Sequence, residues 1–436
     1  MDCKKGSVLS LEQGLIKGVI EENINSKEEY FAYRGIPYAK PPIGKLRFKD
    51  SLSPEKWIGI RDGSKFGNVC AQIDRVSNEV IGSDDCLYLN VYTPRNELSA
   101  KLAVMVWIHG GCFYMGSGND DMYKPDYIIR KDIILVTINY RLGILGFLNL
   151  EDEVASGNQG LKDIVMALRW VRNNIAVFGG DPENVTIFGG SSGAAMVHYL
   201  TMSPLADGLF HKAIAQSGLA TNFWASILVE PRKYVYQLSN MLGFKSFDPK
   251  AIVDFLQEID LEKLIKYQSK IISSTGKNSV FSAFLPGLDN KSKNPFLILP
   301  STISMKFGVR VPFMFGFNDT EASFFFGNSN LARATHGDEL NYLFYGTHYY
   351  ALDLKPHRPG TSSYKVMDCV TQLWTDFAKT GNPTSKTTEL IPILWKPLEK
   401  NPDMYNYLNI NEQVQMESIP KGVQRFEWNP ETKNKL

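Results

Sequence analysis

The sequence predicts an α/β fold in which a mostly parallel β-sheet carries helices on both faces. Apolar runs of strand length recur along the chain, and segments with helical apolar spacing lie between them. Hydrophobic residues make up 44% of the 436 residues and aromatic residues 12%, which is ample for a large core. Strands that are apolar throughout are typical of a sheet that is covered on both faces.

The expected strands are continuous runs of β-branched, aliphatic and aromatic residues. They cover residues 102–108, 133–139, 184–188, 213–215 with its flanks, and 311–316. The spacing of Leu161, Ile164, Leu168 and Val171 predicts a helix that stops before the turn residues at 179–182. A second apolar stripe over residues 366–377 predicts another helix near the end of the chain. This alternation of strands and helices indicates a doubly wound sheet.

Charge and hydropathy exclude several kinds of partner. The net charge is +1 without a block of like charges, which argues against a nucleic acid or an anionic membrane as partner. No apolar run has the length of a membrane span. The first residues are polar and lack the apolar core of a signal peptide, which predicts a cytoplasmic protein, or a secreted one if the true N-terminus is longer.

The chain contains five cysteines: Cys3, Cys70, Cys86, Cys112 and Cys369. There is no C-x-x-C pair, which argues against a zinc site. An odd number of cysteines without a secretion signal favours free thiols.

The most informative motif is a G-x-S-x-G frame over residues 189–193, with Ser191 at its centre. A β-branched run precedes the frame and a helical segment follows it. A strand, a tight glycine-flanked turn and a helix form a nucleophile elbow, which holds the serine hydroxyl clear of its own backbone. The frame alone also occurs by chance, and its place between strand and helix is what predicts a nucleophile at Ser191.

An activated serine needs a base and an orienting acid, which in this class follow it in the order acid, then histidine. His336, His348 and His357 all follow the expected strand at 311–316. The acid is expected directly after that strand, where Asp319 and Glu321 are the candidates. The residues alone do not decide between these two acids.

An oxyanion hole is expected in a glycine-rich loop after an upstream strand. The run His109-Gly110-Gly111-Cys112 follows the strand at 102–108, and its backbone N–H groups could converge on a developing oxyanion together with that of Ser192. A plain β-turn is the alternative reading of the two glycines. The presence of this loop and the elbow in the correct order favours a catalytic role.

At this point the chain resembles the type-B carboxylesterase and cholinesterase-like family of α/β-hydrolases. The resemblance runs from about residue 10 to the C-terminus and implies one α/β-hydrolase domain over residues 1–436. Its most specific motifs are FAYRGIPYA at 31–39, DDCLYLNVY at 84–92, QSG at 216–218 and LWTDFAKTGNP at 373–383.

The resemblance also assigns roles to individual residues. It implies Ser191 as nucleophile, Glu321 rather than Asp319 as acid, and His336 as base. It further implies oxyanion amides at Gly111, Cys112 and Ser192, an acyl-pocket tryptophan at Trp224, and a disulfide between Cys70 and Cys86. Such a bond would stabilise the fold by about 3 kcal/mol. The implied activity is hydrolysis of small carboxylic esters through an acyl-enzyme on Ser191, by a monomer or weak homodimer without metal or cofactor.

Three residues depart from the family pattern: Gly190, Cys112 and Asp84, of which Asp84 replaces a usual glutamate and is a mild change. Gly190 stands where the family usually carries a glutamate, and Cys112 stands where a glycine is frequent. Glycine at position 190 removes a carboxylate that the family has near the base. The thiol of Cys112 narrows the mouth of the site.

The larger departure is a spacing of only 15 positions between Glu321 and His336, where relatives insert many tens. The sequence therefore predicts a family domain shortened between residues 321 and 336. We expect an uncovered strand at 311–316, an exposed phenylalanine run at 324–326, and His336 on a mobile loop. The alternative function is then a catalytically impaired or inactive esterase-like protein that binds ligands or protein partners.

Overall fold

The computed structural model describes residues 4–95, 97–227, 230–274, 283–321, 333–346, 355–399 and 403–421. By its internal contacts the chain divides into two compact units, Met1–Pro356 and His357–Leu436. The first unit contains the large sheet and the three residues predicted to form the triad. In the described part of the chain, no helix is long and apolar enough to cross a membrane.

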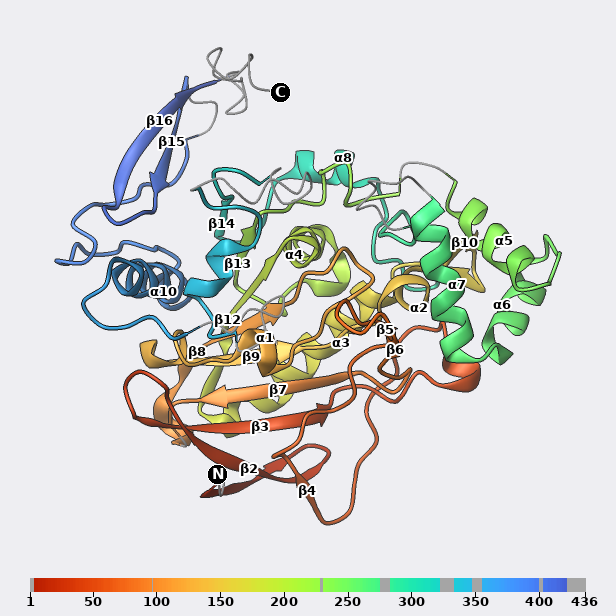
Figure 1. Cartoon of the computed structure of the whole chain (residues 1–436), viewed down its shortest axis with the longest axis horizontal. Coiled ribbons are helices and arrows are strands. Elements are labelled where there is room, and N and C mark those ends of the chain that lie inside the picture. The colour runs from red at the N-terminus through yellow and green to blue at the C-terminus, as the bar shows by residue number, and fades with distance from the viewer. Residues whose placement is uncertain are drawn as a thin grey trace. The chain divides into compact units, whose positions relative to one another are not determined.

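The first unit is built on one large mixed sheet (Figure 1). Its strand order is β1-β2-β3-β7-β9-β8-β12-β13-β14, with β4 paired to β2. The pairs in the run β9-β8-β12-β13-β14 are parallel, whereas the pairs in the run β1-β2-β3-β7-β9 are antiparallel. The strands of this sheet are β1 Lys4–Leu11, β2 Gly14–Glu22, β3 Glu29–Pro37, β4 Ile60–Asp62, β7 Tyr88–Thr93, β8 Leu102–Ile108, β9 Ile133–Ile138, β12 Gly180–Gly190, β13 Lys212–Gln216 and β14 Phe313–Gly316.

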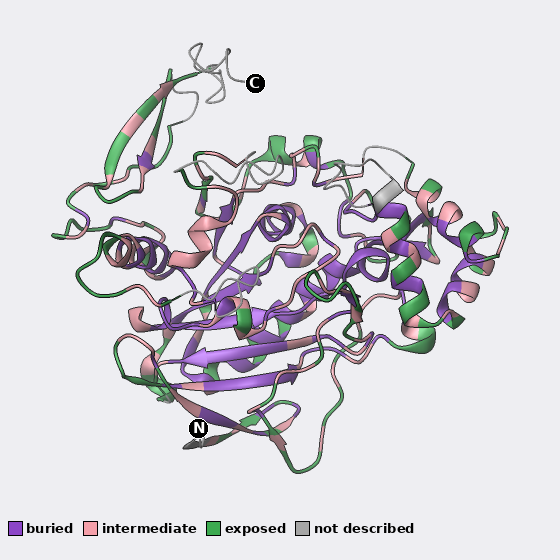
Figure 2. Ribbon diagram, viewed as in Figure 1, coloured by how far each residue is buried: buried purple, intermediate pink, exposed green. Residues whose placement is uncertain are grey.

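The central strands are apolar on both faces, and the structure buries both faces. Every residue of β9 is buried, and so is all of β8 after its first residue (Figure 2). Two short hairpins lie outside the large sheet: β5 Gln72–Ile73 pairs with β6 Val80–Ile81, and β10 Asn149–Asp152 pairs with β11 Ala155–Ser156.

Helices α3 and α4 cover the centre of the sheet. Both pack against β12, and α4 also packs against β8 and β13. Helices α5, α6 and α7 lie together beyond the sheet, beside β10 (Figure 1). The helices of this unit are α1 Asp120–Tyr123, α2 Gly143–Phe147, α3 Gln159–Asn174, α4 Ser192–Met202, α5 Pro231–Met241, α6 Pro249–Glu258, α7 Leu261–Ser274 and α8 Ser301–Ser304.

The second unit contains helix α10 and a hairpin. Helix α10 covers Ser362–Thr380, where the sequence predicts a helix, and ends at Gly381 with φ 78°. Strand β15 (Met404–Asn409) pairs antiparallel with β16 (Gln415–Pro420).

The predicted α/β architecture is confirmed, with differences at element ends. Strand β12 begins at Gly180, so the turn predicted over 179–182 is reduced to Gly179 with φ 83°. Strand β14 begins two residues later than predicted. Strands β1 to β4 were not predicted because they lack continuous apolar runs: β2, for example, mixes buried with partly exposed positions.

Strand β14 is the last strand in the described order of the large sheet, which agrees with the predicted uncovered edge. Phe315 on this strand is 45% exposed. The phenylalanine run at 324–326, and residues 327–332 of the segment expected to carry His336, lie outside the described residues.

Candidate active site

Ser191 occupies the turn between β12 and α4, as the motif predicts. Its backbone has φ 56° and ψ −124°, a strained conformation for a residue with a side chain. A Cβ on Gly189 would lie 2.7 Å from the Ile108 carbonyl oxygen, and one on Gly193 would lie 2.1 Å from the same atom. Only glycine at both positions lets the elbow pack this closely onto β8.

The neighbouring strand β13 fixes the backbone of the elbow. The Ser191 N–H donates to the Gln216 carbonyl at 2.8 Å. A Cβ on Gly218 would lie 2.2 Å from the Ser191 carbonyl oxygen, so the chain after β13 lies directly against the nucleophile. The QSG motif at 216–218 therefore supports the elbow from the adjacent strand.

The structure brings Ser191, Glu321 and His336 into one hydrogen-bonded row. His336 Nε2 lies 2.8 Å from Ser191 Oγ, and His336 Nδ1 lies 2.5 Å from Glu321 Oε2. Glu321, rather than Asp319, is thus the carboxylate bonded to the imidazole. Of the other histidine candidates, His348 lies outside the described residues and His357 belongs to the second compact unit.

Glu321 is held as an acceptor by groups from two segments. Its Oε1 accepts from Ser217 Oγ at 2.5 Å and from the Asn318 N–H at 2.6 Å. Burial opposes the ionisation of Glu321, but the hydrogen bond and charge of His336 and the two donors outweigh it and hold the pKa of Glu321 below its usual value. An ionised carboxylate in this position orients an imidazole and stabilises its charged form.

Hydrogen bonds tie the backbone around His336 to the acid loop after β14. Asn318 Nδ2 donates to the Thr335 carbonyl at 2.8 Å, and both the N–H and the Oγ1 of Thr320 donate to the Ala334 carbonyl at 2.9 Å. We call these three hydrogen bonds the acid–histidine latch. The latch holds His336 close to Glu321 in this structure. The expectation that His336 lies on a mobile loop stays a prediction.

A second carboxylate, Glu339, lies behind the triad. It follows Gly337 on the short helical turn Asp338–Tyr342. Its oxygens accept from Gln216 Nε2 at 3.2 Å and from Asn318 Nδ2 at 2.5 Å. Burial and the nearby charge of Glu321 raise the pKa of Glu339, although its hydrogen bonds oppose the shift.

The glycine-rich loop of residues 110–118, called here the oxyanion loop, passes beside the nucleophile. A Cβ on Gly110 would lie 3.1 Å from Ser191 Cβ, and the Phe113 N–H donates to Ser192 Oγ at 3.4 Å. The loop also forms a turn, because the Gly111 carbonyl accepts from the Tyr114 and Met115 N–H groups. The sequence left open whether the two glycines form a plain β-turn or an oxyanion loop. The structure shows that the loop itself contains a turn, so the two readings do not exclude each other.

Positive φ angles turn the backbone of the oxyanion loop. Gly111 has φ 119° and Cys112 has φ 54°. Ser192 is the first residue of α4, and N–H groups in a first helical turn have no partner within the helix. The Gly111, Cys112 and Ser192 amides thus come from two segments that meet beside Ser191.

His109 lies under the start of the oxyanion loop and is fully buried. Its Nδ1 donates to the Gly110 carbonyl at 2.7 Å, and its ring stacks on Tyr140 at 4.3 Å between centroids. Burial lowers the pKa of His109 to about 4, despite the hydrogen bond to Gly110. The imidazole is therefore neutral at physiological pH.

Trp224 and Cys112 are the two residues that the family resemblance implies as lining the site. The indole of Trp224 lies against Gly218, where an added Cβ would meet the Trp224 ring at 3.0 Å, and its ring centroid is 6.5 Å from that of Phe113. Cys112 is a free, partly exposed cysteine. Burial raises the pKa of the Cys112 thiol, with Arg75 opposing.

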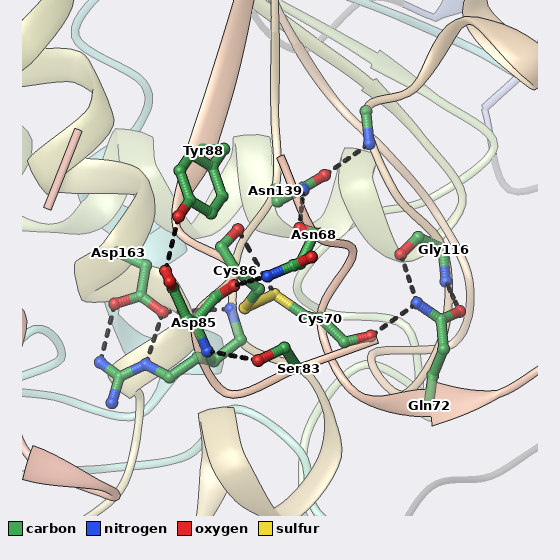
Figure 3. The surroundings of a disulfide bond; sticks show 12 residues. Asn68, Cys70, Gln72, Ser83, Asp85, Cys86, Tyr88, Gly116, Asn139 and Asp163 are labelled. Atoms are coloured by element: carbon green, nitrogen blue, oxygen red, sulfur yellow. Dashed lines mark hydrogen bonds and ion pairs between the residues drawn. A yellow bond between two sulfur atoms is a disulfide. The ribbon is translucent and has the colours of Figure 1, made fainter. Parts of the chain in front are cut away.

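Cys70 and Cys86 form a disulfide (Figure 3). The expectation of free thiols is wrong for this pair, because the odd count says nothing about which cysteines meet in the fold. Within the described part of the chain, Cys112 is not disulfide-bonded. Among the residues that the structure describes, no group of three or more His, Cys, Asp or Glu side chains could hold a metal ion.

The sequence alone assigned no role to Ser217 and Asn318, which donate to Glu321, or to Glu339, which accepts from Asn318. One signal was available for Ser217: polar residues after neighbouring parallel strands gather at one edge of a sheet, and Ser217 follows the strand next to that of Ser191.

A parallel-stranded centre with a serine at a strand-turn-helix elbow defines the α/β-hydrolase class. A sequence profile of the carboxylesterase family matches residues 5–333 and 326–427. The chain belongs to the carboxylesterase family. The two matched pieces overlap at residues 326–333, between Glu321 and His336. The short spacing of these two residues predicts a missing segment at the same place.

Individual relatives support the family assignment. A juvenile hormone esterase of Tribolium castaneum is 43% identical over 312 residues, covering 70% of this chain and 53% of that protein. The chain thus matches about half the length of that relative. Esterase FE4 of Myzus persicae is 30% identical over 524 aligned positions, covering 94% of this chain and 90% of that esterase. This alignment is longer than the 436-residue chain, so the relative has residues without a counterpart here.

Solved structures show the same fold. A PNB esterase structure superposes with a TM-score of 0.78 at 27% identity, covering 95% of this chain and 98% of that chain. Juvenile hormone esterase from Manduca sexta superposes with a TM-score of 0.73 at 25% identity, covering 88% and 92%.

Proposed function

We propose that this protein hydrolyses carboxylic esters through an acyl-enzyme on Ser191. Ser191 Oγ attacks the ester carbonyl while His336 Nε2 takes the hydroxyl proton. The N–H groups of Gly111, Cys112 and Ser192 stabilise the tetrahedral oxyanion. The intermediate collapses as His336 returns the proton to the leaving alcohol. Water, deprotonated by His336, then attacks the acyl-enzyme and releases the carboxylic acid.

The observation that carries this proposal is the row of hydrogen bonds from Ser191 Oγ through His336 to Glu321. Both distances, 2.8 Å and 2.5 Å, are within hydrogen-bonding range before any substrate is bound. The same distances argue against the alternative of an inactive binding protein, which the missing segment and Gly190 motivated.

The test is hydrolysis of a short-chain aryl ester together with labelling by a serine-reactive organophosphonate. The parent protein should hydrolyse the ester and carry the label on Ser191, located by peptide mass spectrometry. Ser191→Ala should abolish both. Ser239→Ala is a suitable control, because Ser239 is a buried serine that donates to the Phe244 carbonyl away from the site. Activity that persists in Ser191→Ala would contradict the assignment.

Three further properties are part of the proposal. The substrates are small carboxylic esters, in line with the family. The protein acts as a monomer or weak homodimer, which sedimentation velocity tests. We also propose a single functional domain over residues 1–436 and a cytoplasmic location, or secretion if a longer N-terminus precedes this chain; limited proteolysis and cell fractionation test these two points.

A further inference from the structure

The oxyanion loop is held at Gly116 by Gln72. Gln72 Nε2 donates to the Gly116 carbonyl at 2.9 Å, and the Gly116 N–H donates to Gln72 Oε1 at 2.7 Å (Figure 3). One side-chain amide thus pairs with both polar groups of one loop residue. Gln72 is only 6% exposed, so water competes little for these bonds. We call this pairing the Gln72 clamp.

Gly116 contacts the part of the loop that carries the predicted oxyanion amides. A Cβ on Gly116 would lie 2.6 Å from the Gly110 carbonyl oxygen and 2.5 Å from His109 Nδ1. A Cβ on Gly111 would lie 2.1 Å from the Met115 carbonyl oxygen. The two limbs of the loop therefore pack backbone against backbone. A displacement of Gly116 must displace Gly110 and Gly111 as well.

The clamp itself is fixed by the disulfide loop. Gln72 Nε2 also donates to the Cys70 carbonyl at 2.9 Å, and Cys70 is bonded to Cys86. A second contact runs through Asn139, whose Nδ2 donates to the Asn68 carbonyl at 3.1 Å while its Oδ1 accepts from the Gly118 N–H at 2.8 Å. The segment beside Cys70 thus holds the oxyanion loop at two places, Gly116 directly and Gly118 through Asn139.

We propose that Gln72 is a positioning residue for the oxyanion amides, and that the Cys70–Cys86 bond keeps Gln72 in place. This inference rests on the proposed ester hydrolysis. The oxyanion exists only in the tetrahedral transition state and intermediate, whereas the ground-state ester makes weaker demands on the amides. Loss of the clamp should therefore lower kcat and leave KM nearly unchanged.

The decisive comparison is Gln72→Ala against Gln257→Ala. Gln257 is also buried and its Nε2 bonds two backbone carbonyls, those of Lys45 and Arg47, away from the loop. Both variants should lose similar thermal stability. Only Gln72→Ala should lose kcat, by about tenfold to a hundredfold, since removing one oxyanion donor costs about a hundredfold to a thousandfold. KM should stay within about twofold.

The affinity for a transition-state mimic is a second measurement, and a lower thermal stability of the protein alone would not change it. Phenylboronic acid forms a tetrahedral adduct with an activated serine, and its affinity should fall in Gln72→Ala by the same factor as kcat/KM. Gln72→Glu retains an acceptor for the Gly116 N–H but loses the donor to the Gly116 and Cys70 carbonyls, so its loss should be intermediate. The double variant Cys70→Ser/Cys86→Ser should show a smaller loss of the same kind.

The outcomes separate the two proposals. An active parent whose Gln72→Ala variant keeps its kcat, or loses no more than Gln257→Ala, overturns the clamp and leaves the proposed function standing. If Gln72→Ala does not fold, Gln72→Glu decides: unchanged kcat and boronate affinity overturn the clamp. A parent protein that neither hydrolyses esters nor binds phenylboronic acid overturns both proposals.

Discussion

Within the elbow, two adjacent glycines differ in what a side chain would meet. A Cβ on Gly189 would lie 2.7 Å from backbone atoms of Ile108 and Gly193. A Cβ on Gly190 would meet only the Trp107 and Leu340 side chains, at 3.4 and 3.5 Å, which is ordinary contact. The family's preference for a larger residue at position 190 is therefore compatible with the space in this protein, whereas position 189 requires glycine.

This difference predicts opposite results for two alanine substitutions. Gly189→Ala should destabilise the fold by about 1–3 kcal/mol and strongly reduce kcat, because the elbow must shift away from β8. Gly190→Ala should change stability by less than about 0.5 kcal/mol and keep kcat within about threefold. Thermal melting and ester hydrolysis check both. Equal damage from the two changes would contradict the packing described for the elbow.

The buried His109 predicts a loss of stability in acid. Unfolded, His109 binds a proton below about pH 6.5, but in the fold only below about pH 4. The contribution of neutral His109 to the free energy of unfolding is therefore fully present above pH 6.5. It is lost as the pH falls toward 4, by about 3 kcal/mol in total. His109→Asn can still donate to the Gly110 carbonyl but does not titrate, so its melting temperature should fall less steeply between pH 6.5 and 4.

Calorimetry at stepped pH measures these slopes. His211→Asn is the control: His211 is only partly buried, so its replacement should change the slope less than His109→Asn. Parallel slopes for the parent and His109→Asn would show that another group controls the acid transition.

Among individual residues, the sequence predicts those whose role depends only on their neighbours along the chain. Ser191 follows from contiguous residues, because an elbow needs a strand, two glycines and a helix in a row. Glu321 and His336 could be chosen only through family resemblance, since several acids and histidines satisfy the chain order. Gln72 and Asn318 could not be predicted, because their hydrogen bonds join segments whose meeting depends on the whole sheet.

At the scale of elements, hydrogen bonds join the chain after β14 to the turn around His336. The acid–histidine latch joins them, and Asn318 contributes both to it and to the Glu339 contact. The predicted strands at 102–108 and 133–139 were found because buried parallel strands are apolar throughout. Strands β1 to β4 at the start of the chain were missed because polar and charged residues interrupt their apolar runs, such as Lys17 in β2 and Arg34 in β3.

Asn318→Ala should lower kcat by about tenfold with KM within about twofold, since a base misplaced by about 1 Å can cost up to about a hundredfold. Asn174→Ala is the matched control, because Asn174 is buried and joins the Trp170 carbonyl to the Glu12 N–H far from the triad. Steady-state kinetics should separate the two variants even if their melting temperatures fall equally. A normal kcat in Asn318→Ala would mean that the latch does not set the position of His336.

For the whole molecule, the end of the described sheet at β14 is the edge relevant to association between chains. No described strand pairs with its outer side, and Phe315 is 45% exposed there. Unpaired apolar edge strands promote association between chains, and a lysine on the edge opposes it. Family resemblance could predict this edge from the short spacing of Glu321 and His336, but not that the triad geometry would survive it.

Phe315→Lys should therefore reduce concentration-dependent self-association and keep kcat within about twofold. Ile58→Lys changes a fully exposed isoleucine elsewhere in the chain and should have no effect on association. Sedimentation velocity over a range of concentrations measures the difference. Equal association of the parent and Phe315→Lys would place the self-associating surface elsewhere.

The acid–histidine latch also makes the chain between Glu321 and Ala334 a natural site of insertion. Asn318 and Thr320 hold the residues at both ends of this segment together. The distance between Glu321 and His336 therefore does not depend on the length of the segment alone. Doubling the length of a flexible loop costs only about 0.6 kcal/mol in closure entropy. A longer or shorter segment between these two fixed ends is therefore expected to keep the hydrogen bonds of the latch. A protein engineer could use the same point to attach a sensor domain or a substrate-selecting cap.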